Sequence, residues 1–410
     1  MTKPIDILNR DGCSSTSDIC VVGGAGHVGL GFSIVLASKG KRILVLDINT
    51  EAMDSIQQGN MPFLESDAEP MLREVLASKR LLFSSNVADV ATAPIIIITI
   101  GTPIDEFLNP DMKGFIKCFE EMLPYLSDEH LLILRSTVYP GMTHWLEEFF
   151  HRKGLHPRIA FCPERIVEGH AIKELQTLPQ IVSGTTLEAE NDAAELFSWI
   201  APGIVRLKPM EAEFAKLFAN AYRYIQFAIT NQFYMMANSA GLDYCRILEG
   251  IKQDYPRLRD IPMAGYAAGP CLLKDTMQLT AFSNNLFNLG HSAMLINEGL
   301  PLYVVSQIEK KYHLHEKTVG ILGMAFKADS DDPRSSLSYK LKKLLKLRAK
   351  CVLTTDPLVR GDTDLVSLEE VIEQSDILIL ATPHSAYRQL HIQNKPVFDI
   401  WNFFGGGSQT

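Results

Sequence analysis

The chain of 410 residues lacks several features that mark whole classes of protein. It has no long basic run, and its net charge is −9, which argues against a surface for nucleic acid or anionic membranes. The longest apolar run, residues 93–100, is far too short to span a bilayer. Residues 1–17 are polar, without the apolar segment of a signal peptide, and we expect a flexible tail there. A cytoplasmic protein with neither a membrane nor a nucleic-acid partner is expected.

The cysteines give no sign of a disulfide framework or a metal site. Seven of them, an odd number, occur at irregular spacing, and no C-x-x-C pair suggests zinc, so no metal is expected. Hydrophobic residues make up 46% of the chain and charged residues 21%, as in folded globular proteins. The length predicts two or three domains.

A glycine-rich turn near the N-terminus predicts a dinucleotide site. The apolar strand 19–22 leads into a turn in which Gly24, Gly26 and Gly29 give G-x-G-x-x-G, and a helix follows over 30–38. Such glycines permit a tight turn and the close approach of a pyrophosphate to the helix N-terminus. The alternative is a turn that only packs helix on strand. The predicted contact residues of this turn are Gly24, Gly26, His27, Val28 and Gly29.

An acid at the end of the next strand indicates which dinucleotide binds. The apolar run from Arg42 ends at Asp47, roughly 20 residues after the motif. A carboxylate there would hold the ribose hydroxyls of NAD and repel the 2′-phosphate of NADP. The expected cofactor is NAD.

Polar residues follow three further apolar strands. Thr102 comes after the run 95–100, Thr137 after the run that starts at Leu131, and Glu164 after the run that starts at Ile159. The carboxyl ends of parallel strands form the ligand-binding edge of open α/β sheets. Each residue alone could be a helix cap or a surface group, but the three together favour a site.

A long helical pattern over residues 211–240 separates this region from the rest of the chain. A helix of this length joins domains or forms an interface. Lys216 and Asn220 are four residues apart and therefore share one of its faces. Lys216 is either a solvated lysine or a partly buried functional one.

A second α/β pattern begins after His313, with strands expected from Thr318, Lys350, Asp376 and Val397. Lys327 and Arg334 follow its first strand and suit an anionic ligand, although they could also be ordinary surface charges. The fold class is therefore α/β, with two doubly wound Rossmann-like domains joined by the long helix and a helical region. A short flexible tail is expected from Phe404 to the end.

Cys271 stands between the two patterns, directly after Gly269-Pro270 and at the start of a predicted helix. A helix N-terminus favours the thiolate, and Asp275 lies one turn further along the same face. The pair could be a nucleophile and a base; otherwise Cys271 is a small buried residue behind a turn.

Six stretches in the same order as in the family resemble the nucleotide-sugar 6-dehydrogenases, which include the UDP-glucose, UDP-N-acetylhexosamine and GDP-mannose dehydrogenases. The resemblance runs from about Asp18 to Phe403. The stretches are Gly24–Leu30, Ser136–Gly141, Pro163–Arg165, Glu213–Lys216 with Asn220, Cys271–Asp275, and Gly323–Lys327 with Asp332–Ser335.

The resemblance implies oxidation of a sugar C6 alcohol to a carboxylate with two NAD. Cys271 would add to the aldehyde as a thiohemiacetal, which a second hydride transfer converts to a thioester that water hydrolyses. Lys216 and Asn220 would stabilise oxyanions. Asp275, through a water held by Thr137, would accept protons, and Glu164 would assist hydrolysis.

The resemblance also implies a binding site and a homodimer built on the central helix. The substrate site would comprise Glu164, Arg165, Lys216, Asn220, Arg257, Gly265, Phe326, Lys327 and Arg334. Arg257 would reach a neighbouring subunit's substrate. The NAD site would comprise the glycine turn together with Asp47, Thr102, Thr137 and Lys274. The expected domains are a tail (1–17), an NAD-binding domain (18–208), a central helical domain (209–314) and a UDP-sugar-binding domain (315–410).

The substrate and two rival functions stay open. Pro163–Gly169 and Tyr255–Arg257 look like the UDP-N-acetylhexosamine branch, whereas Lys274-Asp275 looks like the UDP-glucose and GDP-mannose branches. The family usually has a Gly-Gly pair shortly before the cysteine, where this chain has Ala268-Gly269-Pro270. The rivals are a two-electron hydroxy-acid dehydrogenase, which needs only Lys216 and Asn220, and a non-catalytic nucleotide-sugar sensor.

Overall fold

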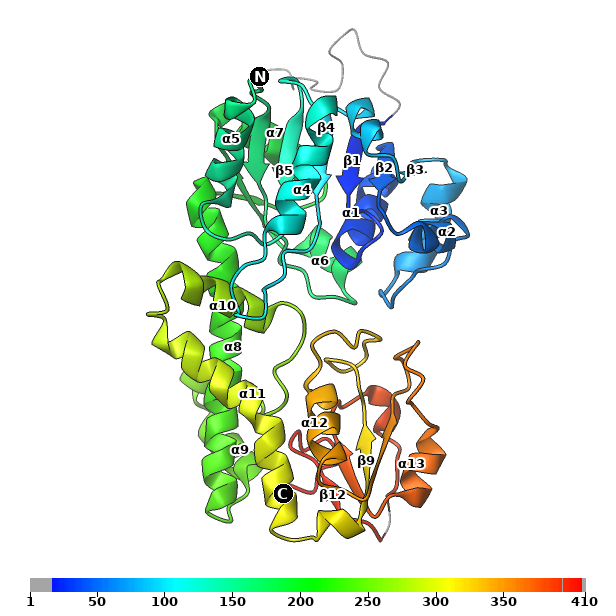
Figure 1. Ribbon diagram of the computed structural model, residues 1–410, viewed down its shortest axis with the longest axis vertical. Helices are drawn as coiled ribbons and strands as arrows, with labels where there is room; N and C mark the ends of the chain where they lie inside the picture. Colours follow the sequence, from blue (N-terminus) through cyan, green and yellow to red (C-terminus); the bar gives the residue numbers. More distant parts are fainter. Residues whose placement is uncertain (1–16, 393, 408–410) are drawn as a thin grey trace. The chain divides into compact units, whose positions relative to one another are not determined.

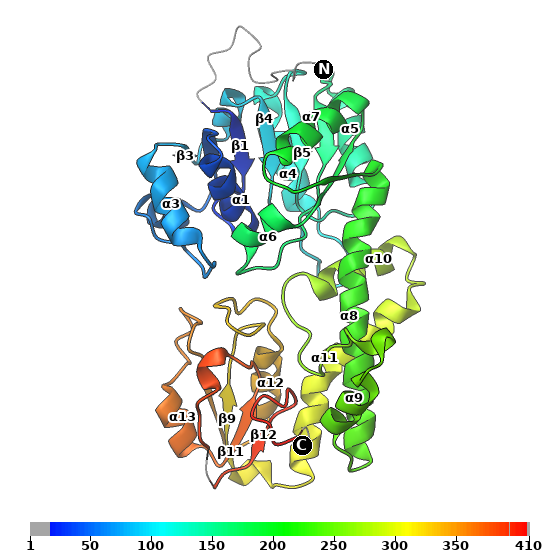
Figure 2. The same cartoon turned by 180° about the vertical axis from the view of Figure 1, so that it is seen from behind.

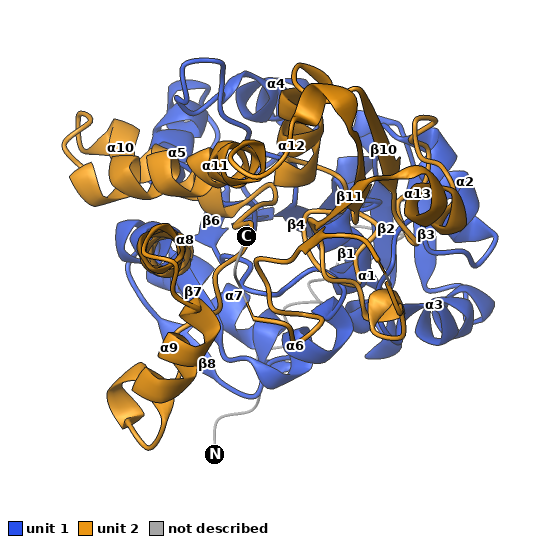
Figure 3. Ribbon diagram, turned by 90° about the horizontal axis from the view of Figure 1, so that it is seen from below, with its two compact units in different colours: residues 1–218 blue, residues 219–410 orange. Residues whose placement is uncertain are grey.

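The computed structural model describes residues 17–392 and 394–407, so most of the predicted N-terminal tail and the last three residues lie outside it. The chain divides into two compact units, residues 1–218 and 219–410 (Figure 3). The predicted division into a tail and three domains stays a prediction. Within the described residues, no helix combines the length and apolar content needed to cross a bilayer.

Unit 1 is built on one sheet of eight strands in the order β3-β2-β1-β4-β5-β6-β7-β8. Its first six strands are parallel and have the strand order of a dinucleotide-binding fold, which confirms the predicted doubly wound class. β7 is antiparallel to β6. The strands are β1 (Ile19–Val22), β2 (Ile43–Leu46), β3 (Leu81–Ser84), β4 (Ile95–Ile98), β5 (Leu131–Leu134), β6 (Arg158–Phe161), β7 (Gln180–Gly184) and β8 (Ile204–Arg206).

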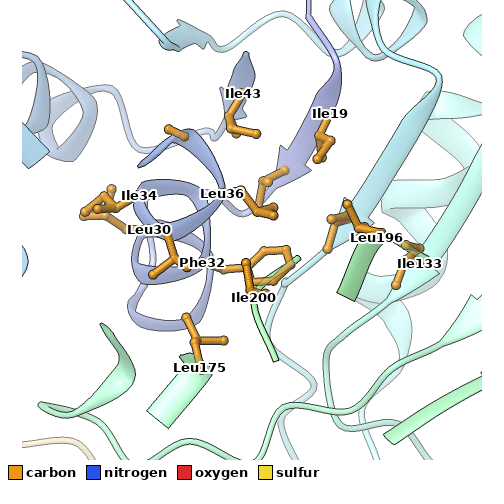
Figure 4. Packing of buried hydrophobic residues seen from close by; sticks show 14 of the residues in the cluster. Ile19, Leu30, Phe32, Ile34, Leu36, Ile43, Ile133, Leu175, Leu196 and Ile200 are labelled. Carbon is orange, nitrogen blue, oxygen red and sulfur yellow. The ribbon is translucent and has the colours of Figure 1, made fainter. Parts of the chain in front are cut away.

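Helices cover both faces of this sheet because its central strands are apolar on both sides. Ile19 and Val21 of β1 belong to the core on one face, whereas Cys20 and Val22 belong to the core on the other. Figure 4 shows the first core, where Leu36 of α1 packs near Ile19 and Ile43. The helices are α1 (His27–Ser38), α2 (Thr50–Gln57), α3 (Ala68–Ala77), α4 (Lys113–Met122), α5 (Met142–Arg152), α6 (Ala171–Thr177) and α7 (Leu187–Ser198).

The predicted long helix is α8 (Pro209–Ser239), which begins in unit 1 and continues into unit 2. In unit 2 it lies beside α11 (Asn288–Glu309), and Asn297 Nδ2 donates to the Tyr224 carbonyl at 3.0 Å (Figures 1 and 2). The helical region also contains α9 (Tyr244–Lys252) and α10 (Leu272–Phe282).

Unit 2 contains a second parallel sheet in the order β10-β9-β11-β12, as predicted for a second doubly wound domain. Its strands are β9 (Thr318–Leu322), β10 (Cys351–Thr355), β11 (Ile377–Leu380) and β12 (Val397–Phe398), with helices α12 (Leu337–Lys346) and α13 (Leu368–Gln374). The described part of the predicted C-terminal tail is hydrogen-bonded: Phe404 N–H donates to Asp399 and Gly407 N–H to Asn402, both at 2.9 Å.

Asp356, at the end of β10, organises the turn that follows β9. Its carboxylate accepts the N–H groups of Met324 and Ala325 at 2.6 and 2.9 Å, and a ring nitrogen of the fully buried His384 lies 3.0 Å away. Burial acts to raise the pKa of Asp356, but His384 and backbone N–H groups outweigh it and hold the pKa at about 2. The ionised acid is therefore a stabilising group of this domain.

Asp356→Asn is expected to destabilise the protein, because the amide cannot accept all of these hydrogen bonds. A pKa lowered to about 2 contributes roughly 2 kcal/mol of stability above pH 4, which is lost as the pH falls through about 2. Thermal melting of the wild type and the variant at pH 7 and pH 3 should show a difference that shrinks at pH 3. The exposed Glu373→Gln is the control, and equal melting at pH 7 would contradict the assignment.

Candidate active site

The glycine turn after β1 has the shape that a dinucleotide requires. A Cβ on Gly24 would lie 2.7 Å from the Val21 carbonyl oxygen, and one on Gly29 would lie 2.5 Å from the Gly23 carbonyl oxygen, so both positions need glycine for packing. A Cβ on Gly26 would have only the Gly23 oxygen near it, at 3.4 Å. Gly26 is exposed, so its open side leaves room for a phosphate.

α1 begins directly after Gly26 and can receive negative charge at its N-terminus. Gly26 supplies no side-chain cap, and the first turn of α1 contains no acid, so its backbone donors suit a phosphate. His27 and Val28 are half-buried there, and the His27 ring lies tilted against the Phe63 ring with 4.0 Å between centroids. These residues fit a pyrophosphate on the helix N-terminus.

Asp47 follows β2 and faces this turn. Its Oδ2 accepts the Ala25 N–H and its Oδ1 the Asn49 N–H, both at 3.0 Å. The side chain is only half-buried, so the oriented carboxylate keeps acceptor capacity for ribose hydroxyls. The turn and the acid together fit the predicted NAD.

Thr102 and Thr137, predicted from different strand ends, lie together at one edge of the sheet. β4 and β5 are parallel neighbours, and the Thr102 hydroxyl donates to the Thr137 carbonyl. The neighbouring Ser136 hydroxyl donates to the Ile100 carbonyl at 2.5 Å. Thr137 is therefore fixed through its backbone, and its side chain is half-buried.

Glu164, after β6, is held by an arginine that the sequence did not single out. The Arg135 guanidinium is fully buried, pairs with the Glu164 carboxylate and donates to Gln180 at 3.1 Å. Glu164 Oε1 accepts the N–H groups of Arg165 and Ile166 at 2.6 and 2.8 Å. The Arg165 guanidinium donates to the Pro179 carbonyl, so the Glu164 segment is well ordered by unit 1 itself.

Lys216 lies on α8 within unit 1, and its side chain is buried to 9% exposure. This excludes the solvated lysine that the local pattern left open. Asn220 is one turn further along α8 and is also buried.

In unit 2 Cys271 directly precedes α10 and is exposed, as a nucleophile must be. The buried structural cysteine considered from the sequence is thereby excluded. Asp275 is fully buried one turn along, with its N–H bonded to the Cys271 carbonyl at 2.9 Å. Asn220 Nδ2 donates to Asp275 Oδ2 at 2.6 Å, and Lys274 pairs with Oδ1 at 3.0 Å. Three of the predicted residues thus come together around one carboxylate.

The loop before Cys271 is fixed at its start by a buried asparagine of α8. Asn231 Oδ1 accepts the Gly265 N–H at 2.8 Å, and Asn231 Nδ2 donates to the Gly265 carbonyl at 3.0 Å. The same Nδ2 donates to Asn297 on α11 at 2.9 Å. A Cβ on Gly265 would lie 2.0 Å from the Trp401 ring, so only glycine fits.

The end of this loop packs on the turn that carries Phe326 and Lys327. Gly269 has a φ of +101°, and a Cβ there would lie 2.6 Å from the Phe326 ring. Its N–H donates to the Ser335 carbonyl at 3.3 Å. Gly269-Pro270 is thus compatible with an ordered loop in which Gly269 takes the left-handed conformation.

The remaining predicted substrate residues lie in two places within unit 2. Lys327 lies over the Phe326 ring at 5.7 Å, and the exposed Arg334 pairs with Asp332 at 2.6 Å. Arg257 is exposed beside Tyr255, to whose hydroxyl it donates at 3.3 Å. The assigned roles of all these residues stay predictions.

Comparison with known families identifies the chain. Profiles of the UDP-glucose/GDP-mannose dehydrogenase family match its NAD binding domain at residues 17–200, its central domain at 210–299 and its UDP binding domain at 320–406. The chain belongs to this family. It is an NAD-dependent nucleotide-sugar dehydrogenase, as the resemblance implied.

Individual relatives cover nearly the whole chain. A UDP-N-acetyl-D-mannosamine dehydrogenase from Pyrococcus horikoshii is 29% identical over 90% of both chains. An NDP-N-acetyl-D-galactosaminuronic acid dehydrogenase from Ralstonia nicotianae is 26% identical over 97% of both. The solved structure of UDP-D-ManNAc dehydrogenase from P. horikoshii has a TM-score of 0.88 at 28% identity and covers 94% of this chain and 96% of its own.

A further solved structure has another substrate in its name. The UDP-glucose dehydrogenase from Pyrobaculum islandicum has a TM-score of 0.86 at 25% identity, with 94% of each chain covered. The fold of the nucleotide-sugar dehydrogenase is therefore shared across substrate branches, and the fold alone does not select the sugar.

Gly26→Ala and Gly29→Ala should separate cofactor binding from packing in this dehydrogenase. A Cβ on Gly26 would have only the Gly23 oxygen near it, at 3.4 Å. Gly26→Ala should therefore nearly keep the wild-type melting temperature but bind NAD roughly ten-fold more weakly, a loss of about 1.4 kcal/mol. Gly29→Ala should destabilise the fold by about 1–3 kcal/mol through overpacking. Calorimetric titration with NAD and thermal melting measure both. Wild-type NAD affinity in Gly26→Ala would contradict a phosphate at this turn.

Proposed function

We propose that this dehydrogenase oxidises the C6 alcohol of a UDP-N-acetylhexosamine to the uronic acid in a four-electron reaction through a thioester on Cys271. The carrying observation is an exposed thiol at the N-terminus of α10, one turn from a buried, hydrogen-bonded aspartate. The helix dipole favours the thiolate, which is the nucleophilic form. A two-electron hydroxy-acid dehydrogenase would leave this cysteine without a task.

The proposed reaction balances as two oxidations and one hydrolysis. NAD, when bound, would supply the hydride acceptor for both oxidations, and the alcohol first becomes the aldehyde with loss of one hydride and one proton. The Cys271 thiolate adds to the aldehyde carbon, and a second hydride leaves the thiohemiacetal to give the thioester. Water then replaces the sulfur, which releases the carboxylate and regenerates the thiol.

The chain's own groups have distinct parts in this scheme. Lys216 and one amide N–H of Asn220 stabilise the oxyanions, while the other Asn220 N–H is donated to Asp275. Asp275 accepts protons through a water held by Thr137. Its ion pair with Lys274 keeps the carboxylate in place for this task.

Glu164 assists hydrolysis of the thioester. Arg135 pairs with its Oε2, and two backbone N–H groups donate to its Oε1, so the carboxylate is oriented before any substrate arrives. Oε2, which accepts only from Arg135, has a further lone pair and can accept from water.

The names of the relatives support the proposed sugar. Relatives 29% and 26% identical to this chain are named for N-acetylated sugars. UDP-glucose is the second candidate, because a UDP-glucose dehydrogenase is similar in fold at 25% identity. Lys327 and Arg334 bind the nucleotide and its diphosphate in this proposal, and Phe326 and Gly265 line the sugar site.

The ratio of NADH formed to UDP-sugar consumed tests the proposal. With UDP-N-acetylmannosamine or UDP-N-acetylglucosamine the wild type should form two NADH per sugar. Cys271→Ser should form uronate far more slowly than the wild type or not at all. Cys351→Ser removes another exposed cysteine, on β10, and should behave like the wild type. UDP-glucose and GDP-mannose complete the panel.

The rival functions give different ratios in the same assay. One NADH per substrate, with Cys271→Ser unaffected, would indicate a two-electron dehydrogenase. No NADH, with nucleotide-sugar binding retained, would indicate a sensor. Preference for UDP-glucose with two NADH would correct only the substrate.

We also propose that the enzyme is a homodimer formed through α8. Tyr222, Ile229, Phe233 and Met236 recur at helical spacing along α8 and are 63%, 45%, 45% and 62% exposed. Exposed apolar side chains that recur along one helix in this way are typical of an interface. In a dimer the exposed Arg257 can reach the neighbouring subunit's substrate, as the resemblance implies.

Ile229→Asp with Phe233→Asp should convert the dimer to a monomer, because two buried, unpaired charges per subunit would oppose association. Light scattering coupled to size-exclusion chromatography measures the mass. Leu347→Asp, which replaces an apolar side chain that is 85% exposed next to α12, should leave the dimer intact. A monomeric wild type, or a dimeric double variant, would contradict this interface.

A further inference from the structure

A buried glutamate on α8, Glu213, has no part in the scheme above. Its side chain is 1% exposed. Oε2 accepts the Gly141 N–H at 2.6 Å, and Oε1 accepts the Thr143 N–H at 2.8 Å and the Thr143 hydroxyl at 2.6 Å. Every contact lies within unit 1.

These three bonds cap the N-terminus of another helix. α5 starts at Met142, and its own N-cap, Gly141, has a φ of +93° and provides no side-chain acceptor. Glu213 supplies the missing acceptor from α8, and its negative charge lies at the positive end of the α5 dipole. The beginning of α8 is therefore fastened to the beginning of α5.

The hydrogen bonds of Glu213 to the start of α5 fix two predicted parts of the active site. Lys216 follows Glu213 by three residues, so both point from the same face of α8. Gly141, on the other side of the bonds, ends the short segment that begins with Thr137. One carboxylate thus sets the rotation of α8 at Lys216 and holds the end of the Thr137 segment.

Ionisation of the buried Glu213 carboxyl lowers the stability of the fold as the pH rises. Burial raises the pKa of Glu213, and the hydrogen bonds from Thr143 and Gly141 offset this only in part. A carboxyl with a raised pKa in the folded state stabilises the fold at low pH, and this stabilisation is lost as the pH rises and the acid ionises. A neutral residue would avoid that loss.

We propose that Glu213 is a positioning residue that acts through Lys216: it holds the ammonium group where the oxyanion forms. This inference rests on the proposed function, because it takes the oxyanion role of Lys216 as given. It assigns no contact between Glu213 and the substrate.

A double-mutant cycle on kcat tests the coupling. Glu213→Gln leaves one acceptor oxygen and turns an NH₂ toward a backbone N–H, so it should lower kcat by up to about 100-fold, the scale of a misplacement of about 1 Å. KM for NAD should stay within about two-fold. In the Lys216→Ala background the same substitution should change kcat by less than about two-fold, since its effect is already lost. Single-turnover uronate formation, quantified by mass spectrometry, gives the low rates.

Glu65→Gln is the matched control. Glu65 accepts the Gly169 and Ala171 N–H groups at the start of α6 at 3.0 and 2.6 Å, and burial raises its pKa too, but it is not on α8. Any effect of Glu65→Gln on kcat should be the same with and without Lys216→Ala. If Glu213→Gln does not fold, Thr143→Val takes its place in the cycle. Thr143→Val removes one hydroxyl donor and keeps the shape, so it should show a smaller coupled effect.

The outcomes separate this inference from the proposed function. If Glu213→Gln and Thr143→Val lower kcat equally in both backgrounds, or not at all, the positioning role is overturned. If Lys216→Ala alone leaves kcat unchanged, the oxyanion role of Lys216 fails, and the inference fails with it for that separate reason.

Discussion

Two amide side chains of α8 hold the cysteine loop on both sides of its nucleophile, and the rest of unit 2 is arranged around them. Asn231 exchanges two hydrogen bonds with Gly265, six residues before Cys271, and Asn220 donates to Asp275, four residues after it. Asn231 and Asp275 are fully buried, so an unmade hydrogen bond there would cost about 1–3 kcal/mol. The loop is thereby ordered before a substrate binds, and Cys271 at its end remains exposed.

The two sheets use the same arrangement of an aspartate and a turn for different purposes. In each, an aspartate after the second strand accepts backbone N–H groups of the turn after the first: Asp47 from Ala25, and Asp356 from Met324 and Ala325. Asp47 stays half-buried and can meet a ribose, whereas the Asp356 side chain is completely buried against His384. The first turn therefore fits a dinucleotide, and the second supports the segment of Phe326 and Lys327.

The sequence predicted those parts of the fold and site that depend on local pattern. Apolar runs gave most strands, the long helix predicted over 211–240 is α8 at 209–239, and the glycine turn lies where expected. It missed β3 and β8, which are partly exposed, and the buried β7 with its antiparallel pairing to β6. It also missed Arg135, Asn231 and the Asp356–His384 pair, whose partners lie 27 to 66 residues away and leave no periodic signal.

Trapping of the covalent intermediate tests most directly whether this ordered loop serves a thioester. The enzyme is mixed with NAD and a UDP-N-acetylhexosamine, quenched in acid during turnover and digested, and the peptide containing Cys271 is weighed by mass spectrometry. The account predicts an added mass equal to the nucleotide-sugar acyl group on Cys271, which disappears when substrate is exhausted. Steady uronate formation with an unmodified Cys271, or with the acyl group on another residue, would contradict it.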